Sequence, residues 1–312
     1  MKHYDVVVLG DYCFDMIFAN MPRFPQPGAE VFATELISTG GGAFTVAAAM
    51  RRLGIDVGWP AYFGSDEYSA FVYGAAVQEG LDLDLVHVAP FPRRAVTAAI
   101  PFQGERAFVS YADPEPPDLF AHWLASVERC TFRHLHLGAL PEPEQLAPLV
   151  ERARSIGATI SSDCFDGPPL QRPVVFCAQL GLVDTFMPNM REACILAGTT
   201  EPMEAIRYLA ERVKTLIVKD GAHGAWIAHD GTVERIPGID PGTVVDTTGA
   251  GDCFTAGLLY GQVVAGYDLR RSVQCGNICG GLSTTRLGGV TGAPNLAGLE
   301  HWLAGLPATM GR

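Results

Sequence analysis

Asp246-Thr247-Thr248-Gly249-Ala250-Gly251-Asp252 is the stretch from which the rest of the chain can be interpreted. A short, partly β-branched run precedes it, and an apolar, small-residue segment that predicts a helix follows it to Ala265. Gly249, Ala250 and Gly251 therefore lie where a loop enters a helix. Small residues at such a place let the free backbone N–H groups of the helix approach an anion.

Asp252 lies in the first turn of that helix and has two interpretations. As a cap, its carboxylate would only satisfy free backbone amides. Beside an anion-binding helix end, it is also placed to act as a base. Such a base takes the proton from a hydroxyl group that attacks a phosphate. This stretch alone leaves both interpretations open.

The composition sets the class of protein. The chain has 312 residues, of which 48% are hydrophobic and 18% charged, which suits one large α/β domain. A net charge of −12 without a basic run argues against nucleic-acid binding. The eight cysteines lack metal-binding spacing, so we expect free thiols in a reducing compartment. Without a signal-like segment or a membrane-length apolar run, the sequence predicts a cytoplasmic protein that does not bind membranes.

The N-terminal segment predicts a ligand-binding edge. Tyr4 to Leu9 is a continuous apolar run, typical of a strand buried in a parallel sheet. Asp11 and Asp15 follow it, and α/β sheets bind ligands beyond the carboxyl ends of their strands. The alternative is that these acids only terminate the strand. The segment after the strand is not GxGxxG, which argues against a dinucleotide-binding oxidoreductase.

Two excursions leave the main α/β pattern, at about residues 16–39 and 95–111. The first contains an expected exposed strand over residues 30–36, and the second reads as a hairpin that turns at residues 102–105. We expect the two to pair as a small β-lid over the ligand edge. The exposed strand carries Val31 and Phe32, and an open edge of this kind invites pairing, so a homodimer through the lid is expected.

Glycines also open an earlier helix. Gly40, Gly41 and Gly42 precede an alanine-rich segment that runs to Leu53 and ends at Gly54. Such a helix entry permits close approach of a ligand, and a flexible turn is the alternative.

From Phe132 onward, strands and helices alternate. Asn189 and Glu192 fit a capping box, although a functional role is equally compatible with the sequence. Lys219 ends a buried strand, where a lysine needs a partner, and a phosphate would serve. Gly221 and Gly224 lie in the turn that follows.

Taken together, these motifs resemble the PfkB/ribokinase family of carbohydrate and nucleoside kinases. The resemblance rests on residues 246–252 with Phe254 and Gly257, on the segment from Gly40 to Gly54, and on the Asn189 and Gly221 motifs. It covers nearly the whole chain. It implies a ribokinase-like three-layer α/β/α fold with a mainly parallel sheet and a β-lid, in a single domain over residues 1–312.

The resemblance also implies roles for individual residues. Asp252 would be the catalytic base, and the amides of Gly249, Ala250 and Gly251 would form an anion hole for the transferring phosphoryl group. The other implied roles cover ATP, Mg²⁺, the acceptor and, in some members, a monovalent cation such as K⁺. The nucleotide would be bound by Asn189, Lys219, Gly221 and Gly224, and Mg²⁺ would be held through water by Glu192. The acceptor would be bound by Asp15, Gly41 and Thr45. The monovalent cation would be bound by Asp246 and Thr248.

Two departures from the family pattern bear on the acceptor. Thr45 stands where many sugar kinases have asparagine, and Asp163-Cys164-Phe165-Asp166 replaces an Asp-Pro-Asn-x-Arg motif. The leading hypothesis is an ATP-dependent kinase of a sugar or sugar acid. A nucleoside kinase of the same fold is the alternative. An alternative from another class of function is a catalytically silent, sugar-binding regulatory protein. The intact Asp252 argues against this alternative.

Overall fold

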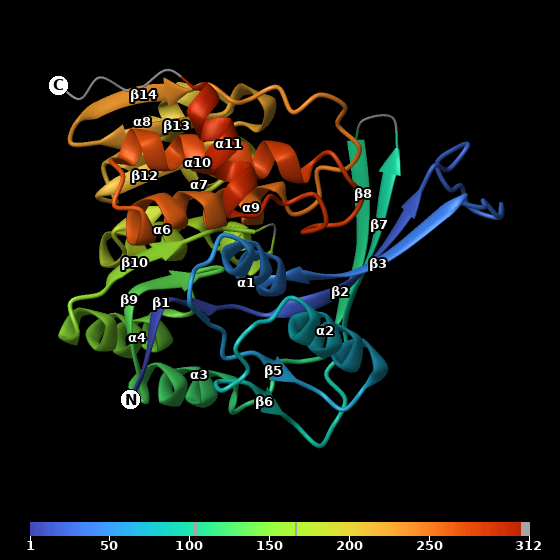
Figure 1. The fold of residues 1–312 in the computed structure, drawn as a ribbon, viewed down its shortest axis with the longest axis horizontal. Helices are drawn as coiled ribbons and strands as arrows, with labels where there is room; N and C mark the ends of the chain where they lie inside the picture. Colours follow the sequence, from blue (N-terminus) through green and yellow to red (C-terminus); the bar gives the residue numbers. More distant parts are fainter. Residues whose placement is uncertain (103–104, 166, 307–312) are drawn as a thin grey trace.

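The computed structural model describes residues 1–102, 105–165 and 167–306. Its centre is an eight-stranded sheet with the order β14-β13-β12-β11-β10-β9-β1-β4 (Figure 1). The strands are parallel except for β13 and β14, which are antiparallel to their neighbours. Their bounds are β1 (Lys2–Leu9), β4 (Val57–Gly58), β9 (Cys130–Leu137), β10 (Thr159–Ser162), β11 (Thr185–Phe186), β12 (Thr215–Lys219), β13 (Ala225–His229) and β14 (Thr232–Ile236).

Helices cover both faces of this sheet, because its inner strands are apolar on both sides. In β1, Val6 and Val8 pack into one hydrophobic core, and Val7 and Leu9 pack into another. The first core contains α1 (Ala43–Arg52), α2 (Glu67–Gln78), α9 (Ala250–Leu259), α10 (Leu269–Ser283) and α11 (Leu296–Gly305). The second contains α3 (Leu119–Glu128), α4 (Pro143–Ser155), α6 (Pro173–Gln179), α7 (Met190–Ala197) and α8 (Pro202–Ala210). The three-layer α/β/α architecture is therefore confirmed.

Short elements complete the chain. A two-stranded sheet joins β5 (Tyr62–Phe63) to β6 (His87–Val88). The remaining elements are α5 (Pro168–Gln171), the 3₁₀ turns η1 (Leu180–Leu182) and η2 (Gly221–His223), and the π-helical segment η3 (Tyr260–Val264), which continues α9. Within the described residues, no helix combines the length and apolar character that crossing a membrane requires. All eight cysteines are free thiols, as the sequence predicts.

A second, four-stranded sheet forms the lid and projects from one end of the body (Figure 1). Its order is β3-β2-β7-β8, with β2 (Tyr12–Ala19), β3 (Glu35–Gly42), β7 (Ala95–Phe102) and β8 (Glu105–Ala112). Strand β2 is antiparallel to β3 along its whole length and parallel to β7. The lid and its hairpin β7–β8 are confirmed. The predicted turn at residues 102–105 includes residues 103 and 104, which lie outside the described part.

The first excursion was predicted incorrectly in two respects. The strand expected over residues 30–36 instead runs from Glu35 to Gly42, so the three glycines end a strand rather than form a loop. It does not pair with the hairpin, because β2 lies between them. Strand β2 was missed because only Gly10 and Asp11 separate it from β1, where a βαβ pattern places a turn.

Candidate active site

The loop before α9 leaves a helix N-terminus free to bind an anion. Gly249 is the N-cap residue, with a φ of 70°, and no side chain caps the helix. A Cβ at Gly249 would lie 2.6 Å from the carbonyl oxygen of Gly289, so both the conformation and the packing require glycine. The Ala250 amide donates to the carbonyl of Thr247 at 3.3 Å, but no side chain caps the first turn. With the helix dipole, this end of α9 is favourable for negative charge.

Asp246 fixes the conformation of this loop. Its carboxylate is buried and accepts hydrogen bonds from the backbone N–H of Thr248, at 2.9 Å, and of Gly288, at 3.0 Å. The amide of Asp246 donates to the carbonyl of Thr284 at 3.1 Å. The carboxylate and the loop backbone are thus held together close to the start of α9.

Asp252 lies in the first turn of α9 and is partly buried. Burial, and next the negative charge of Asp163, raise the pKa of Asp252 to about 7, although Lys219 opposes the shift. Among the described residues, no hydrogen bond joins the Asp252 carboxylate to an amide of α9, so the structure gives the capping interpretation no support. A carboxyl group with this pKa holds and releases a proton near neutral pH, as a general base must.

Lys219, at the end of β12, has a carboxylate of the protein as its partner, where the sequence predicts a phosphate. Its Nζ donates to Oδ1 of Asp163 at 2.5 Å, and Oδ2 of Asp163 accepts from the Thr255 hydroxyl at 2.7 Å. Burial alone would lower the pKa of Lys219, but the charges of Asp163 and Glu192 outweigh it and raise that pKa. A Cβ at Gly251 would lie 3.5 Å from Nζ, which places the ammonium beside the α9 N-terminus.

Asn189 and Glu192 form the capping box that the sequence predicts at α7. The Asn189 side chain accepts from the amide of Glu192 at 2.9 Å, and the Glu192 carboxylate accepts from the amide of Asn189 at 2.8 Å. An isolated β-bridge joins Asn189 to Lys219, so the start of α7 adjoins the end of β12. Burial raises the pKa of Glu192, and the charge of Lys219 opposes this shift.

Asp15 and Gly41 face each other across the lid strands β2 and β3. Asp15 is buried and accepts from the Cys13 thiol at 3.1 Å, and a Cβ at Gly41 would overlap its Oδ2 atom. Burial raises the pKa of Asp15, and the negative charge of Asp246 adds to the effect. The alternative that Asp15 only terminates the main-sheet strand is wrong, because Asp15 lies inside the lid strand β2. Asp11 pairs with Arg93 at 2.7 Å.

Thr45 is buried in the first turn of α1. Its hydroxyl donates to the carbonyl of Gly40 at 3.4 Å, and its Oγ1 would lie 3.2 Å from a Cβ at Gly289. Thr45 therefore packs against the segment that also supports Gly249.

Gly221 and Gly224 both have positive φ angles in the turn between β12 and β13. A Cβ at Gly224 would overlap the carbonyl oxygen of Ile236, whereas one at Gly221 would meet open space. Gly224 is therefore required by backbone packing, and Gly221 by its conformation.

The sequence interpretation did not include Asp163 in the site, although it noted this acid at a strand end. In the structure, Asp163 bonds both Lys219 and Thr255, and so joins β10, β12 and α9. Thr255 lies one turn after Asp252, on the same side of α9. An aspartate directly after a buried strand was the available signal, but its partners are distant in sequence.

Comparison with known proteins agrees with this geometry. The model of the pfkB family of carbohydrate kinases matches residues 4–296. The fructokinase of Klebsiella pneumoniae is 28% identical over 95% of this chain and 98% of its own. The 2-dehydro-3-deoxygluconokinase of Bacillus subtilis is 26% identical over 96% of this chain and 95% of its own.

Solved structures show the same fold at lower sequence identity. A fructokinase double mutant from Vibrio cholerae, bound to fructose, ADP and potassium ion, has a TM-score of 0.77 and 24% identity, with 97% of this chain and 99% of that chain covered. A Burkholderia thailandensis nucleoside kinase in complex with inosine has a TM-score of 0.73 and 22% identity, with 96% of each chain covered.

The family match spans most of the chain, and the fold and the free helix N-terminus beside Asp252 are consistent with it. The chain is therefore a member of the pfkB family of carbohydrate kinases, which are phosphotransferases with an alcohol group as acceptor.

Proposed function

We propose that the protein transfers the γ-phosphoryl group of ATP to a hydroxyl group of a sugar or sugar acid. Asp252 acts as the base, and the amides of Gly249, Ala250 and Gly251 form the anion hole. The observation that carries this proposal is the carboxyl group of Asp252, with a pKa of about 7, in the first turn of an uncapped helix. Phosphoryl transfer needs alignment and charge neutralisation of this kind more than covalent catalysis.

The nucleotide side of the site is built by Asn189, Lys219, Gly221 and Gly224. The open space at Gly221 supports a nucleotide beside this turn. Lys219 lies next to the α9 N-terminus, so its ammonium can exchange Asp163 for a phosphate oxygen without leaving the site. ATP binding is then a competition between two anions for one lysine.

The residues present also fit Mg²⁺ that is carried by the triphosphate. Among the described residues, no group of three or more His, Cys, Asp or Glu side chains could hold a metal ion. Mg²⁺ commonly keeps several waters and uses one or two carboxylates together with substrate phosphates. Glu192 would hold it through water, and the ion would neutralise charge on the triphosphate. Asp246 and Thr248 would support a K⁺ ion through the carboxylate and loop oxygens.

The acceptor side comprises Asp15, Gly41 and Thr45. The Asp15 carboxylate can accept hydrogen bonds from substrate hydroxyl groups, and Gly41 leaves room for this carboxylate. Fructokinase and 2-dehydro-3-deoxygluconokinase relatives support a sugar or a sugar acid. A nucleoside is the second candidate. It is favoured by the half-exposed ring of Phe165, just after β10, on which a base could stack.

An ADP-release screen over sugars, sugar acids and nucleosides tests this function. Asp252→Asn should lower turnover about 10²–10⁴-fold, the usual contribution of a general base, with unchanged folding. Asp240→Asn is the matched control, because Asp240 is exposed and asparagine can still accept from the Gly242 amide. Near-normal turnover by Asp252→Asn would exclude its role as base. A response to nucleosides alone would replace the sugar assignment, and ATP binding without turnover on any acceptor would favour the silent protein.

A further inference from the structure

A row of polar side chains crosses the central sheet away from the catalytic edge. The strand register places His136, Ser161, Thr185, Thr215 and His229 side by side on β9 to β13. All but His229 are buried. Inner strands of a sheet covered on both faces are usually apolar, and buried polar groups cost free energy unless they are hydrogen-bonded. Most of the row meets this cost by hydrogen bonds between its own members, Ser161 with His136 at 3.0 Å and Thr215 with His229 at 2.9 Å.

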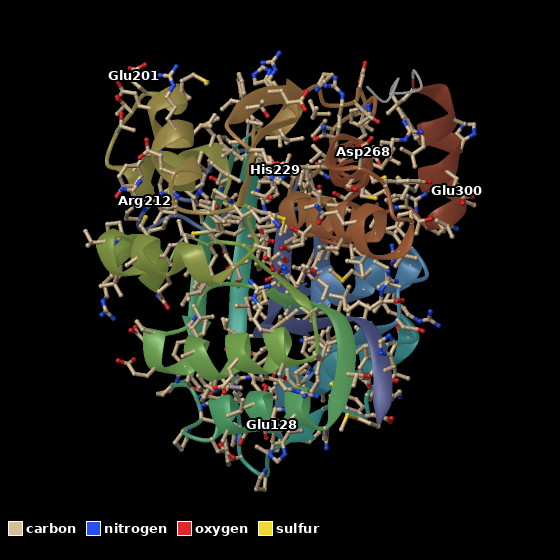
Figure 2. The ribbon with its side chains drawn as sticks, turned by 90° about the vertical axis from the view of Figure 1, so that its left-hand side faces the viewer. Glu128, Glu201, Arg212, His229, Asp268 and Glu300 are labelled. Carbon is tan, nitrogen blue, oxygen red and sulfur yellow. The ribbon has the colours of Figure 1, made fainter. Side chains whose placement is uncertain are left out.

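A cavity of about 330 Å³ opens beside this row, at the amino ends of the strands. The π-helical segment η3 borders it through Gln262 and Val263, and π-helical turns frequently occur at functional sites. Figure 2 views the molecule from the side opposite the lid, and His229, which lines the cavity, lies in the upper part of that view, close to its vertical midline. The cavity and the proposed active site thus lie at opposite ends of the sheet.

The cavity wall offers positive charge and hydrogen-bond donors. Lys214 is exposed, and its ammonium has no partner within the described part of the chain. Arg133 has only a long ion pair with Asp5, at 3.4 Å. The one lining carboxylate, Asp184, is already neutralised by Arg154 at 2.7 Å. The Thr185 hydroxyl has no hydrogen-bond partner among the described residues, although the residue as a whole is 94% buried. This combination favours an oxyanion.

A ladder of polar contacts joins the cavity to the active site. From the Thr159 hydroxyl, which lines the cavity, it runs to His134 Nδ1 at 2.7 Å and from His134 Nε2 to the Ser161 hydroxyl at 2.7 Å. The Ser161 hydroxyl lies 3.0 Å from His136 Nδ1. His136 Nε2 lies 3.7 Å from Oδ2 of Asp163, the residue that binds Lys219.

This ladder has two arrangements with the same number of protons. If the Thr159 hydroxyl donates to His134, the following groups donate in the same direction and His136 points an N–H at Asp163. If the Thr159 hydroxyl donates into the cavity instead, His134 donates back to it. His136 then points a lone pair at the Asp163 carboxylate, which is unfavourable. Passing to the second arrangement takes up one proton at Thr159 from solvent in the open cavity. The proton that leaves His136 Nε2 passes by way of the Asp163 carboxylate, 3.7 Å away, to solvent at the active site.

We propose that the cavity is a second ligand site, for a small oxyanion such as a phosphate or carboxylate group, and that the ladder transmits its occupancy to Asp163. An oxyanion draws the Thr159 hydroxyl into the cavity and so selects the second arrangement. Binding in the cavity stands independently of the proposed kinase function, whereas the effect on catalysis rests on it.

Binding is tested by calorimetric titration with inorganic phosphate, and separately with malonate, at constant ionic strength. Saturating MgADP occupies the nucleotide site. We expect the titration to show anion binding whose affinity weakens at least tenfold in the double variant Arg133→Gln/Lys214→Gln. Arg207→Gln, an exposed arginine on α8, is the control and should leave this affinity unchanged. Binding of phosphate alone or malonate alone identifies the group. An unchanged titration of the double variant overturns the site.

Transmission is tested at saturating ATP and acceptor, so that added anions cannot compete at the catalytic edge. We expect the bound anion to change kcat at least twofold in the natural protein and to have no effect in Thr159→Val, which removes the first hydroxyl of the ladder. Each protein is compared with its own kcat in the absence of anion, and Thr159→Val must keep its melting temperature. A kcat that does not respond to the bound anion overturns the transmission. A protein with anion binding but no kinase activity would instead disprove the proposed function.

Discussion

Asp252 is subject to opposing electrostatic effects. Burial and the carboxylates of Asp163, Asp15 and Glu192 raise its pKa, while the ammonium of Lys219 lowers it. The cluster is therefore rich in negative charge before any nucleotide binds. A cation bound beside the cluster would counter this repulsion and favour the ionised form of Asp252, whereas the negative charge of the triphosphate itself would oppose it.

The pH dependence of kcat/KM reports the state of this base. Activity needs the ionised carboxylate, so kcat/KM should fall as pH decreases through about 7, the pKa of Asp252 in the free enzyme. Asp163→Asn removes a charge that raises this pKa, so the acid limb should move to lower pH even though kcat falls. Initial rates from pH 5 to 9 measure the acid limb of kcat/KM in the natural protein and in Asp163→Asn. An acid limb that stays in place in Asp163→Asn contradicts the electrostatic role of Asp163.

Gly41 tests the contact between the lid strands. In Gly41→Ala the new methyl group would overlap Oδ2 of Asp15 and lie 2.6 Å from the Cys13 sulfur, so the carboxylate must move. We expect KM for the acceptor to rise at least tenfold and stability to fall by about 1–3 kcal/mol, as overpacking usually does. Gly74→Ala in α2 is the control. It meets no atom within 4 Å and should gain roughly 0.5–1 kcal/mol. Acceptor titrations and urea unfolding measure both effects.

At the scale of the element, α7 combines a structural and a proposed catalytic role. The Glu192 carboxylate already accepts the Asn189 amide, so its proposed work for Mg²⁺ must be separated from capping. Glu192→Gln keeps an oxygen that can complete the capping box but removes the charge. We expect an unchanged melting temperature and a rise of about tenfold in KM for MgATP, similar to the loss of an outer-sphere metal contact. Equal KM values would leave Glu192 as a cap only.

The elements differ in how well the sequence predicts them. The segment from residue 250 and the alanine-rich helix carry strong helix patterns, which α9 and α1 confirm. The capping box that the sequence predicts at Asn189 is confirmed in α7. Strand β2 was missed because its register with β3 is set by pairing with a distant segment rather than by local pattern. The partner of Lys219 was likewise unpredictable, because Asp163 lies 56 residues away in sequence.

At the scale of the whole molecule, the lid leaves apolar surface uncovered. Val109 and Tyr111 on β8 and Leu36 on β3 are 67%, 55% and 56% exposed. Strands β3 and β8 are the two edges of the lid sheet, and an edge strand can pair with a further strand. We therefore propose that two lids pair in a homodimer.

Light scattering after size exclusion tests this dimer. The natural protein should have twice the mass of the chain, and Val109→Lys should shift it toward the monomer, because a charge replaces an apolar contact. Val174→Lys on α6 is the matched control, since Val174 is 80% exposed and lies outside the lid. A natural protein with the mass of one chain would exclude the lid dimer.

The register between β1 and β9 also has a consequence for the order in which the chain folds during synthesis. His3 lies beside Thr131, 128 residues later in the chain. At 5–20 residues per second, a ribosome needs about 6–25 s to make that interval. Throughout it, one edge of β1 lacks its native partner while the apolar segment is already outside the ribosome. Slower translation before Cys130 would prolong this exposure, and chaperones that bind extended apolar segments would find β1 available then.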